Sequence, residues 1–105
     1  MHARIVTSHL LPGRTEEAVD LWRDKVAPAY MGTKGFRGAF LLGDRASGKA
    51  VSITLWDSQA AMASTEKSGQ FQHAVGLFAQ MFVAPPESSR LEVMLQVAGT
   101  GPDES

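Results

Sequence analysis

The stretch of sequence that decides the fold is KAVSITLWDS, residues 49–58. Within the predicted strand Lys49–Trp56, Val51, Ile53 and Leu55 alternate with the small or polar residues 50, 52 and 54, and this period of two is typical of a β-strand with two different faces. Asp57 or Ser58 can then cap a helix, because a short polar side chain accepts a hydrogen bond from a free backbone N–H of the first turn. The stretch therefore predicts a strand that is followed directly by a helix.

Two further strands are predicted upstream of this one. Phe36–Leu42 has the composition of a strand, and the connector Gly43–Gly48 joins it to the strand at Lys49–Trp56 as a hairpin. Ala3–Leu11 is rich in β-forming residues, and Pro12-Gly13 ends it. Three strands therefore precede the second helix.

Apolar residues at helical spacing predict two helical regions. The first starts at Thr15, the expected N-cap, and its apolar stripe runs to Tyr30, with Pro28 expected to bend or end it late. The second covers Gln59–Phe82 and is interrupted at Ser68-Gly69. Both regions carry their apolar residues on one side, so each is expected to cover a sheet.

A fourth strand, Arg90–Val97, completes the order β-α-β-β-α-β. This order predicts an α+β, ferredoxin-like fold, with a four-stranded antiparallel sheet and two helices on one face. Residues 1–98 form the expected domain, and the small, polar residues 99–105 are expected to be a flexible tail.

The strands in the middle of the chain carry apolar residues on both faces. Phe40 and Leu42 alternate with Ala39 and Leu41, whereas a face in contact with water normally reads as polar. A second copy of the chain is the simplest cover for the face that the helices leave free. The pattern therefore predicts a homodimer in which two sheets pack face to face.

Composition excludes several classes of function. The 105 residues include 10 Lys plus Arg and 11 Asp plus Glu, and this balance argues against nucleic acid as the main partner. The chain contains no cysteine, which excludes disulfides, thiolate-bound metals and thiol nucleophiles. No stretch approaches the ~18 apolar residues of a membrane span, and no signal peptide is recognised, so a cytoplasmic protein without membrane contacts is expected.

The run GDRASGK at 43–49 matches half of a phosphate-binding loop. The next residue of such a loop is Ser or Thr and a helix follows, whereas here Ala50 and a strand follow. The run is therefore predicted to be a hairpin turn with Gly48 at a positive φ.

Few residues are candidates for a site, and each has a plain structural alternative. His9 either lines the space between sheet and helices, if its strand face meets the helices, or is a partly solvated side chain near the strand end. His73 lies off the apolar stripe and is expected at the surface unless its face meets a pocket or a partner. Trp56 is expected first as a core or interface anchor, and Tyr30 has a hydroxyl that a buried site must satisfy. The three histidines lack the spacing of metal ligands, so no metal site is expected.

Two runs of the sequence resemble the antibiotic biosynthesis monooxygenase (ABM) family. They are GFRGAFLL at 35–42 and ITLWDSQAAM at 53–62, within a likeness that covers about residues 3–97. The resemblance implies a dimeric α/β barrel with a pocket between sheet and helices in each subunit. It also implies cofactor-free oxidation of quinol-like aromatics in a dry pocket whose polar groups stabilise a substrate anion.

The resemblance also suggests roles for individual residues. Trp56 matches a position in the family's motif that is largely structural, and Thr7 and His9 occupy the strand face that lines the family's pocket. Haem-degrading members of the family resemble one another in three residues: an Asn in the first strand, a Trp in the second helix, and a His in the second helix that binds the iron. This chain has no Asn and no Trp at 58–82, Thr7 falls near the Asn position, and His73 matches the ligand position only approximately.

The first hypothesis is therefore a cofactor-independent ABM-type monooxygenase acting on a small aromatic or quinol-like metabolite. His9 is its candidate base, and Thr7, Tyr30, Trp56 and His73 are its candidate substrate-binding residues. The alternative is a non-catalytic dimer that binds a small apolar ligand or serves as a stress or accessory protein. A haem-degrading oxygenase is the third hypothesis.

Overall fold

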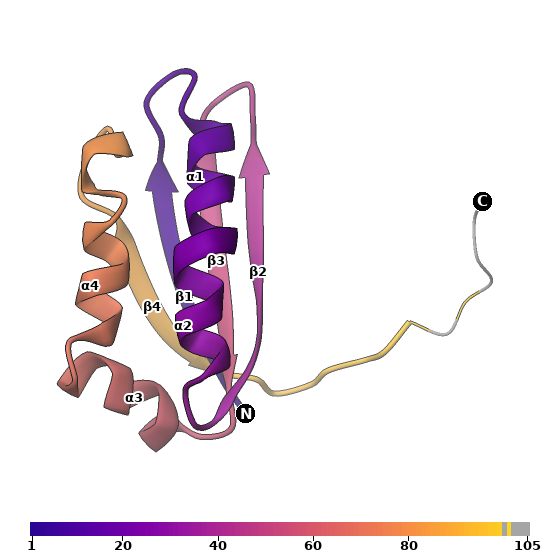
Figure 1. The fold of residues 1–105 in the computed structure, drawn as a ribbon. Coiled ribbons are helices and arrows are strands. Elements are labelled where there is room, and N and C mark those ends of the chain that lie inside the picture. The colour runs from indigo at the N-terminus through magenta and orange to yellow at the C-terminus, as the bar shows by residue number, and fades with distance from the viewer. Residues whose placement is uncertain (100, 102–105) are drawn as a thin grey trace.

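The fold is a single antiparallel sheet with helices on one face. A computed structural model describes residues 1–99 and 101. The four strands have the order β2-β3-β1-β4 in the sheet, and Figure 1 shows the helices on one side of it. The strands are β1 (His2–His9), β2 (Phe36–Asp44), β3 (Lys49–Trp56) and β4 (Glu87–Glu92). This arrangement confirms the predicted α+β, ferredoxin-like fold. Within the predicted tail, residues 100 and 102–105 lie outside the described part of the chain.

The helices form two groups. The first group is continuous and consists of α1 (Thr15–Leu21), the π-helical turn η1 (Trp22–Val26) and α2 (Ala27–Met31). The second group consists of α3 (Gln59–Lys67), α4 (Gln70–Gly76) and the short 3₁₀ turn η2 (Ala79–Met81). Within residues 1–99 and 101, none of these helices has the length and hydropathy of a bilayer span.

The two helix starts differ in how they are capped. Ser58 caps α3, because its Oγ accepts a hydrogen bond from the Ala61 N–H at 3.1 Å. The expectation that Thr15 caps α1 is wrong. The Ala18 N–H donates to the Arg14 carbonyl at 3.0 Å, so Arg14 takes the cap position and Thr15 is the first helical residue.

The first helix passes Pro28 by means of a wider turn. In η1 the N–H of Ala27 donates to the carbonyl of Trp22, five residues back. In a regular α-helix the ring of Pro28 would collide with the carbonyl of Asp24, and a π-helical turn relieves that collision. The helix therefore continues to Met31.

The last strand lies earlier in the chain than the predicted Arg90–Val97. β4 pairs only with β1 in the sheet, and the final pair of that ladder joins Glu92 to His2. Residues 93–97 continue as an extended segment away from the body of the subunit, with Met94 89% exposed (Figure 1). Their alternation is that of a strand, but no strand of the described chain lies beside them.

The turn between β2 and β3 confirms the prediction that these two strands form a hairpin. Asp44 accepts hydrogen bonds from the Ala46 N–H and the Ser47 hydroxyl, which close the turn. Gly48 has φ +80, and a Cβ at this position would lie 2.7 Å from the carbonyl oxygen of Leu10. Both the φ angle and the close approach require glycine.

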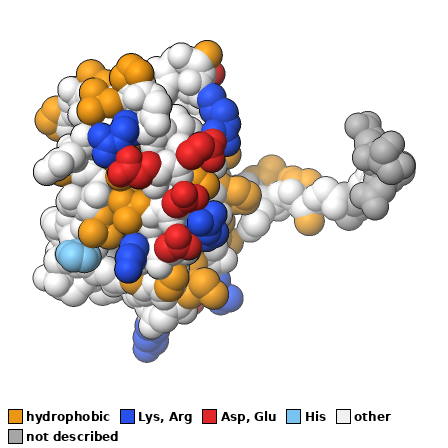
Figure 2. All heavy atoms as spheres, turned by 45° about the horizontal axis from the view of Figure 1, so that its top comes forward, with side chains coloured by type: hydrophobic (Ala, Val, Ile, Leu, Met, Phe, Trp, Pro, Cys, Tyr) orange, Lys and Arg blue, Asp and Glu red, His pale blue; other side chains and the backbone are white. Residues whose placement is uncertain are grey.

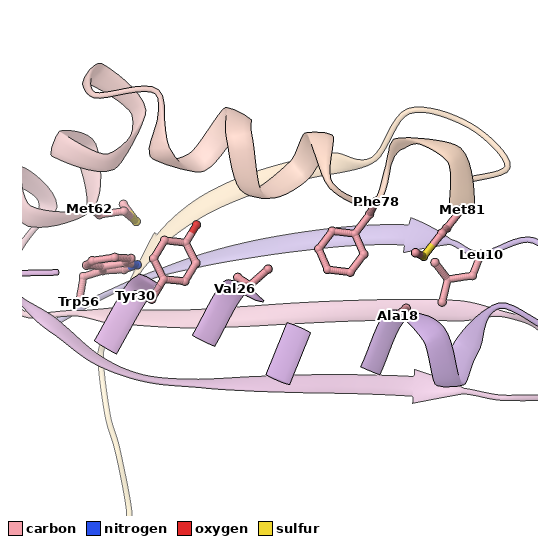
Figure 3. Close-up of a cluster of buried hydrophobic side chains, with 8 residues drawn as sticks. All are labelled: Leu10, Ala18, Val26, Tyr30, Trp56, Met62, Phe78 and Met81. Carbon is pink, nitrogen blue, oxygen red and sulfur yellow. The ribbon is translucent and has the colours of Figure 1, made fainter. Parts of the chain in front are cut away.

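A compact cluster of side chains forms the core between the sheet and the helices. Figure 3 shows its eight buried members: Leu10, Ala18, Val26, Tyr30, Trp56, Met62, Phe78 and Met81. Trp56 is fully buried, and its indole N–H donates to the Thr54 hydroxyl at 3.0 Å. Its ring meets that of Tyr30 edge to face at 5.5 Å. Trp56 is therefore a core residue.

The face of β1 that meets the helices is the opposite of the one expected to line the pocket. The Arg4 side chain donates to the Met62 carbonyl and the Thr65 hydroxyl on α3, so its face of the strand meets the helices. Side chains alternate along a strand, which places Thr7 and His9 on the outer face of the sheet. The expectation that their face lines the space between sheet and helices is therefore wrong.

The outer face of the sheet is apolar across three strands. Ile5 on β1 pairs with Ile53 on β3, which pairs with Phe40 on β2. Phe40 is 58% exposed, and Leu42 and Leu91 are also about half exposed. No element of the described chain covers this surface (Figure 1).

The outer side of the first helix is solvated. Arg23 forms ion pairs with Asp20 and Asp24, each at 3.1 Å. Figure 2 shows acidic and basic side chains side by side on this part of the surface. The visible face therefore has no large patch of one charge.

Candidate active site

A cavity of about 170 Å³ lies between the sheet and the two helix groups. β1 and β3 form its floor, and the first helix and α4 form its walls. Residues 41–43, Arg45 and Lys49 of the hairpin also line it, together with Thr15 at the start of α1. The cavity therefore extends from the core to the hairpin end of the sheet.

The floor of the cavity is polar and its walls are apolar. Arg4 and Ser8 from β1 and Ser52 and Thr54 from β3 line the floor. Val6 of β1 adds an apolar side chain to the floor, and the walls are rich in aromatic and aliphatic side chains, among them Val19, Trp22, Val26, Phe71, Val75, Phe78 and Phe82. Such a lining suits a flat apolar molecule that carries a small number of polar groups.

Arg4 is the main charged group inside the subunit. It is 2% exposed, and its Nη2 donates to Met62 O at 3.0 Å, to Thr65 Oγ1 at 2.9 Å and to Glu66 Oε2 at 3.1 Å. The guanidinium carbon lies 4.0 Å from the centre of the Phe71 ring, which holds the group by a cation–π contact. Its Nη1 is buried and has no hydrogen-bond partner among the described residues.

Tyr30 is the second polar group at the inner part of the cavity. Its ring is held by Phe36, stacked at 5.7 Å, and by Trp56. Burial raises the pKa of the Tyr30 hydroxyl above its usual value of 10.0, and the nearby charge of Arg4 opposes this shift. The hydroxyl is therefore protonated at neutral pH and can donate a hydrogen bond to a ligand.

Of the residues expected from the sequence, the cavity contains only Tyr30. Thr7 and His9 lie on the outer face of the sheet, and Trp56 packs behind Tyr30 without lining the cavity. His73 lines a second hollow between α4 and the first helix, together with Lys25, Gln70 and Leu77, and Tyr30 lines both spaces. The structure therefore does not bring the five candidates together.

Sequence reasoning missed the polar floor of the cavity. The alternation in β3 separates Ser52 and Thr54 from Val51 and Ile53, but it does not show which of the two faces meets the helices. Arg4 offered a local signal, because a charged residue is unusual between apolar neighbours such as Ala3 and Ile5 in a strand. The described chain has no group of three or more metal-ligating side chains close enough to hold an ion.

The fold and the cavity together define a class of protein: a ferredoxin-like α+β domain with a ligand-sized space between sheet and helices. A model of the antibiotic biosynthesis monooxygenase family matches residues 1–77, and the chain therefore belongs to this family. A search of curated proteins finds no match.

Solved structures with the same fold are numerous. One is a monooxygenase from the gene ActVA-Orf6 of Streptomyces coelicolor in complex with nanaomycin D, at TM-score 0.78 and 14% identity over 94% of this chain and 92% of that one. Another is Rv0793 from Mycobacterium tuberculosis, at TM-score 0.72 and 15% identity over 92% and 98%. A variant of MhuD with two manganese protoporphyrin IX molecules per active site matches at TM-score 0.75 and 21% identity over 94% and 100%. At these identities the likeness establishes the fold.

Proposed function

We propose that this protein is a monooxygenase that oxidises a small aromatic or quinol-like metabolite in the cavity between sheet and helices, without a resident cofactor. The observation that carries the proposal is the cavity itself, which has aromatic walls and, on its inner side, the hydroxyl of Tyr30 and the guanidinium of Arg4. Membership of the ABM family and the fold shared with the nanaomycin-bound monooxygenase support it.

The cavity suits chemistry in which the substrate supplies the electrons. An anthrone, for example, reacts with O₂ so that one oxygen atom becomes the new carbonyl and the other leaves as water. The substrate must first lose a proton to become electron-rich, and this proton passes to water because the described lining has no His, Asp or Glu. The apolar walls disfavour the resulting anion, and the fixed positive charge of Arg4 and the hydroxyl of Tyr30 offset that cost. Tyr30 is placed to donate a hydrogen bond to the oxygen that carries this charge.

Oxygen uptake tests this function. With a panel of hydroquinones and anthrones we expect turnover by the wild-type protein and a fall in kcat/KM of about tenfold or more for Tyr30→Phe, which removes one hydrogen bond made to a charged oxygen. His9→Ala is the matched control and is expected to leave the rate unchanged, because His9 lies outside the cavity. Absence of uptake with every substrate would contradict the proposal.

A specific observation favours the alternative of a non-catalytic ligand-binding protein. The described lining of the cavity includes no histidine, aspartate or glutamate, so no ordinary general base faces the ligand. In this alternative, aromatic compounds raise the melting temperature of the protein without any oxygen uptake. The same substrate panel separates the two functions.

The lining does not suit a histidine-ligated haem. His73 opens into the separate hollow, and no other histidine of the described chain reaches the cavity. Haemin added to the protein is therefore expected to give no saturable shift of the Soret band. A saturable shift that His73→Ala abolishes would restore the haem-degrading hypothesis.

We also propose that the protein is a homodimer. The apolar outer face of the sheet, built around Ile5, Phe40 and Ile53, supports a second copy packed against it. The extended residues 93–97, which lead away from the body of the subunit, carry further exposed apolar side chains that a partner can cover. The functional unit in this proposal is two chains with one cavity each.

A further inference from the structure

We propose that dioxygen reaches the inner end of the cavity through the second hollow, the one between α4 and the first helix. The inference rests on the proposed function, because that function makes O₂ a reactant. It adds a route for O₂ that is separate from the space that the aromatic substrate occupies.

The size and shape of the cavity give the reason for a separate route. Its volume is about 170 Å³, so a bound aromatic molecule leaves little of it free. The cavity extends to the hairpin end of the sheet, where Thr15 and Lys49 line it. A substrate that enters at this end stands between it and the inner part of the cavity. O₂ that arrives after the substrate therefore needs another way in.

The second hollow leads to the inner end of the cavity. Val26, Tyr30 and Ala74 line both spaces, so the wall between the two is one side chain thick there. Val26 and Tyr30 are buried and form the deep end of the hollow, whereas Ala29 and Leu77 are exposed and line its outer part. The hollow therefore runs from the surface to the side chains that bound the cavity.

The helix α4 is the part of this wall that yields most easily. None of its residues is buried, whereas every other helical segment of the described chain contains at least one buried residue. An element with few buried contacts opens locally at a small cost in free energy. Ala74, which α4 contributes to the wall, has only a methyl group as its side chain. Small movements of α4 at Ala74 therefore open a passage for a molecule of the size of O₂.

The wall suits an apolar gas and excludes ions. Val26, Ala74 and the ring of Tyr30 are apolar surfaces, and apolar solutes transfer favourably from water to such surroundings. Lys25 and His73 also line the hollow, but both are exposed, so their polar groups stay in contact with water at its outer part. The route therefore admits O₂ while hydrated ions remain outside.

Quenching of Trp56 fluorescence by O₂ measures access to the inner end of the cavity. Trp56 is fully buried, and its ring lies 5.5 Å from that of Tyr30, so O₂ that passes the wall comes close to it. The chain has two tryptophans, and the Trp22→Phe variant, in which Trp56 is the sole one, is the reference protein. Fluorescence lifetimes under increasing O₂ pressure give the second-order rate constant of quenching.

Two variants of the hollow should change this rate constant in opposite directions. Ala29 lines the hollow and not the cavity, and Ala29→Phe should lower the constant by about threefold or more because the added ring fills the hollow. Leu77 also lines only the hollow, and Leu77→Ala should raise the constant by about twofold because it widens the outer part.

The matched control is Gln72→Phe, which adds the same ring at an exposed position of α4 that lines neither space. It should leave the rate constant unchanged. Equal constants for Ala29→Phe and the reference protein would overturn the route, and so would a constant for Leu77→Ala that does not exceed the reference. Leu77→Ala adds no bulk, so it still decides if Ala29→Phe does not fold. The measurement needs no turnover, so oxygen uptake with the hydroquinones and anthrones tests the proposed function separately.

Discussion

Trp56→Ala is expected to lower the free energy of unfolding by about 3–5 kcal/mol, the usual cost of truncating a large buried aromatic side chain. Trp56 is the largest fully buried side chain, and it contacts the rings of Tyr30 and Phe36 at 5.5 and 5.4 Å between centres. Native domains are stable by only about 5–15 kcal/mol, so the variant should be close to unfolding at 37 °C.

Denaturation in urea at one fixed protein concentration measures this loss. The concentration must be constant because dimerisation would itself contribute to the apparent stability. Trp56→Phe is the matched control: it keeps a ring in the core and loses the indole hydrogen bond to Thr54, so a smaller loss is expected. A loss below about 1 kcal/mol for Trp56→Ala would mean that the packing around Tyr30 does not depend on Trp56.

Phe40→Asp is expected to convert the proposed dimer into a folded monomer. Phe40 lies on the outer face of the sheet next to Ile53, where a partner would bury it. An unpaired carboxylate in such an interface costs several kcal/mol, which weakens association by a factor of about a thousand or more. Sedimentation at micromolar concentration measures the change.

The control for this experiment is Gln72→Asp, which places the same carboxylate at an exposed position of α4. It is expected to leave the mass in solution unchanged. A wild-type protein that sediments as a monomer would contradict the dimer, and so would a Phe40→Asp variant with the mass of the wild type.

The strands and helices could be predicted because each depends on a local pattern. The alternation over Lys49–Trp56, the glycine in the hairpin and the break at Ser68-Gly69 all appear where the sequence indicates them. β4 was misplaced because alternation continues beyond Glu92, and local patterns do not show where a partner strand ends.

The site was harder to predict because a period of two does not say which face of a strand is inside. The face of β1 with Thr7 and His9 was assigned to the pocket, whereas the face with Arg4 and Ser8 meets the helices. β3, which forms part of the floor, reverses the usual rule, since its polar Ser52 and Thr54 point inward while its apolar Ile53 lies on the outer face of the sheet. Tyr30 was found because it belongs to the apolar stripe of a helix, and that stripe allows only one orientation.

The wider turn at η1 determines which side chains of the first helix point into the cavity, because a π-helical turn contains more residues than an α-helical one. Ala18, Trp22, Val26 and Tyr30 all line the cavity at a spacing of four residues. In a regular α-helix each such step drifts by about 40°, so Tyr30 would point about 120° away from Ala18. The π-helical turn at Trp22–Val26 offsets part of this drift. Deleting one residue from this turn would therefore rotate Tyr30 out of the cavity while the remaining side chains keep their identities. An insertion or deletion at η1 is thus a route by which ligand specificity can change during evolution.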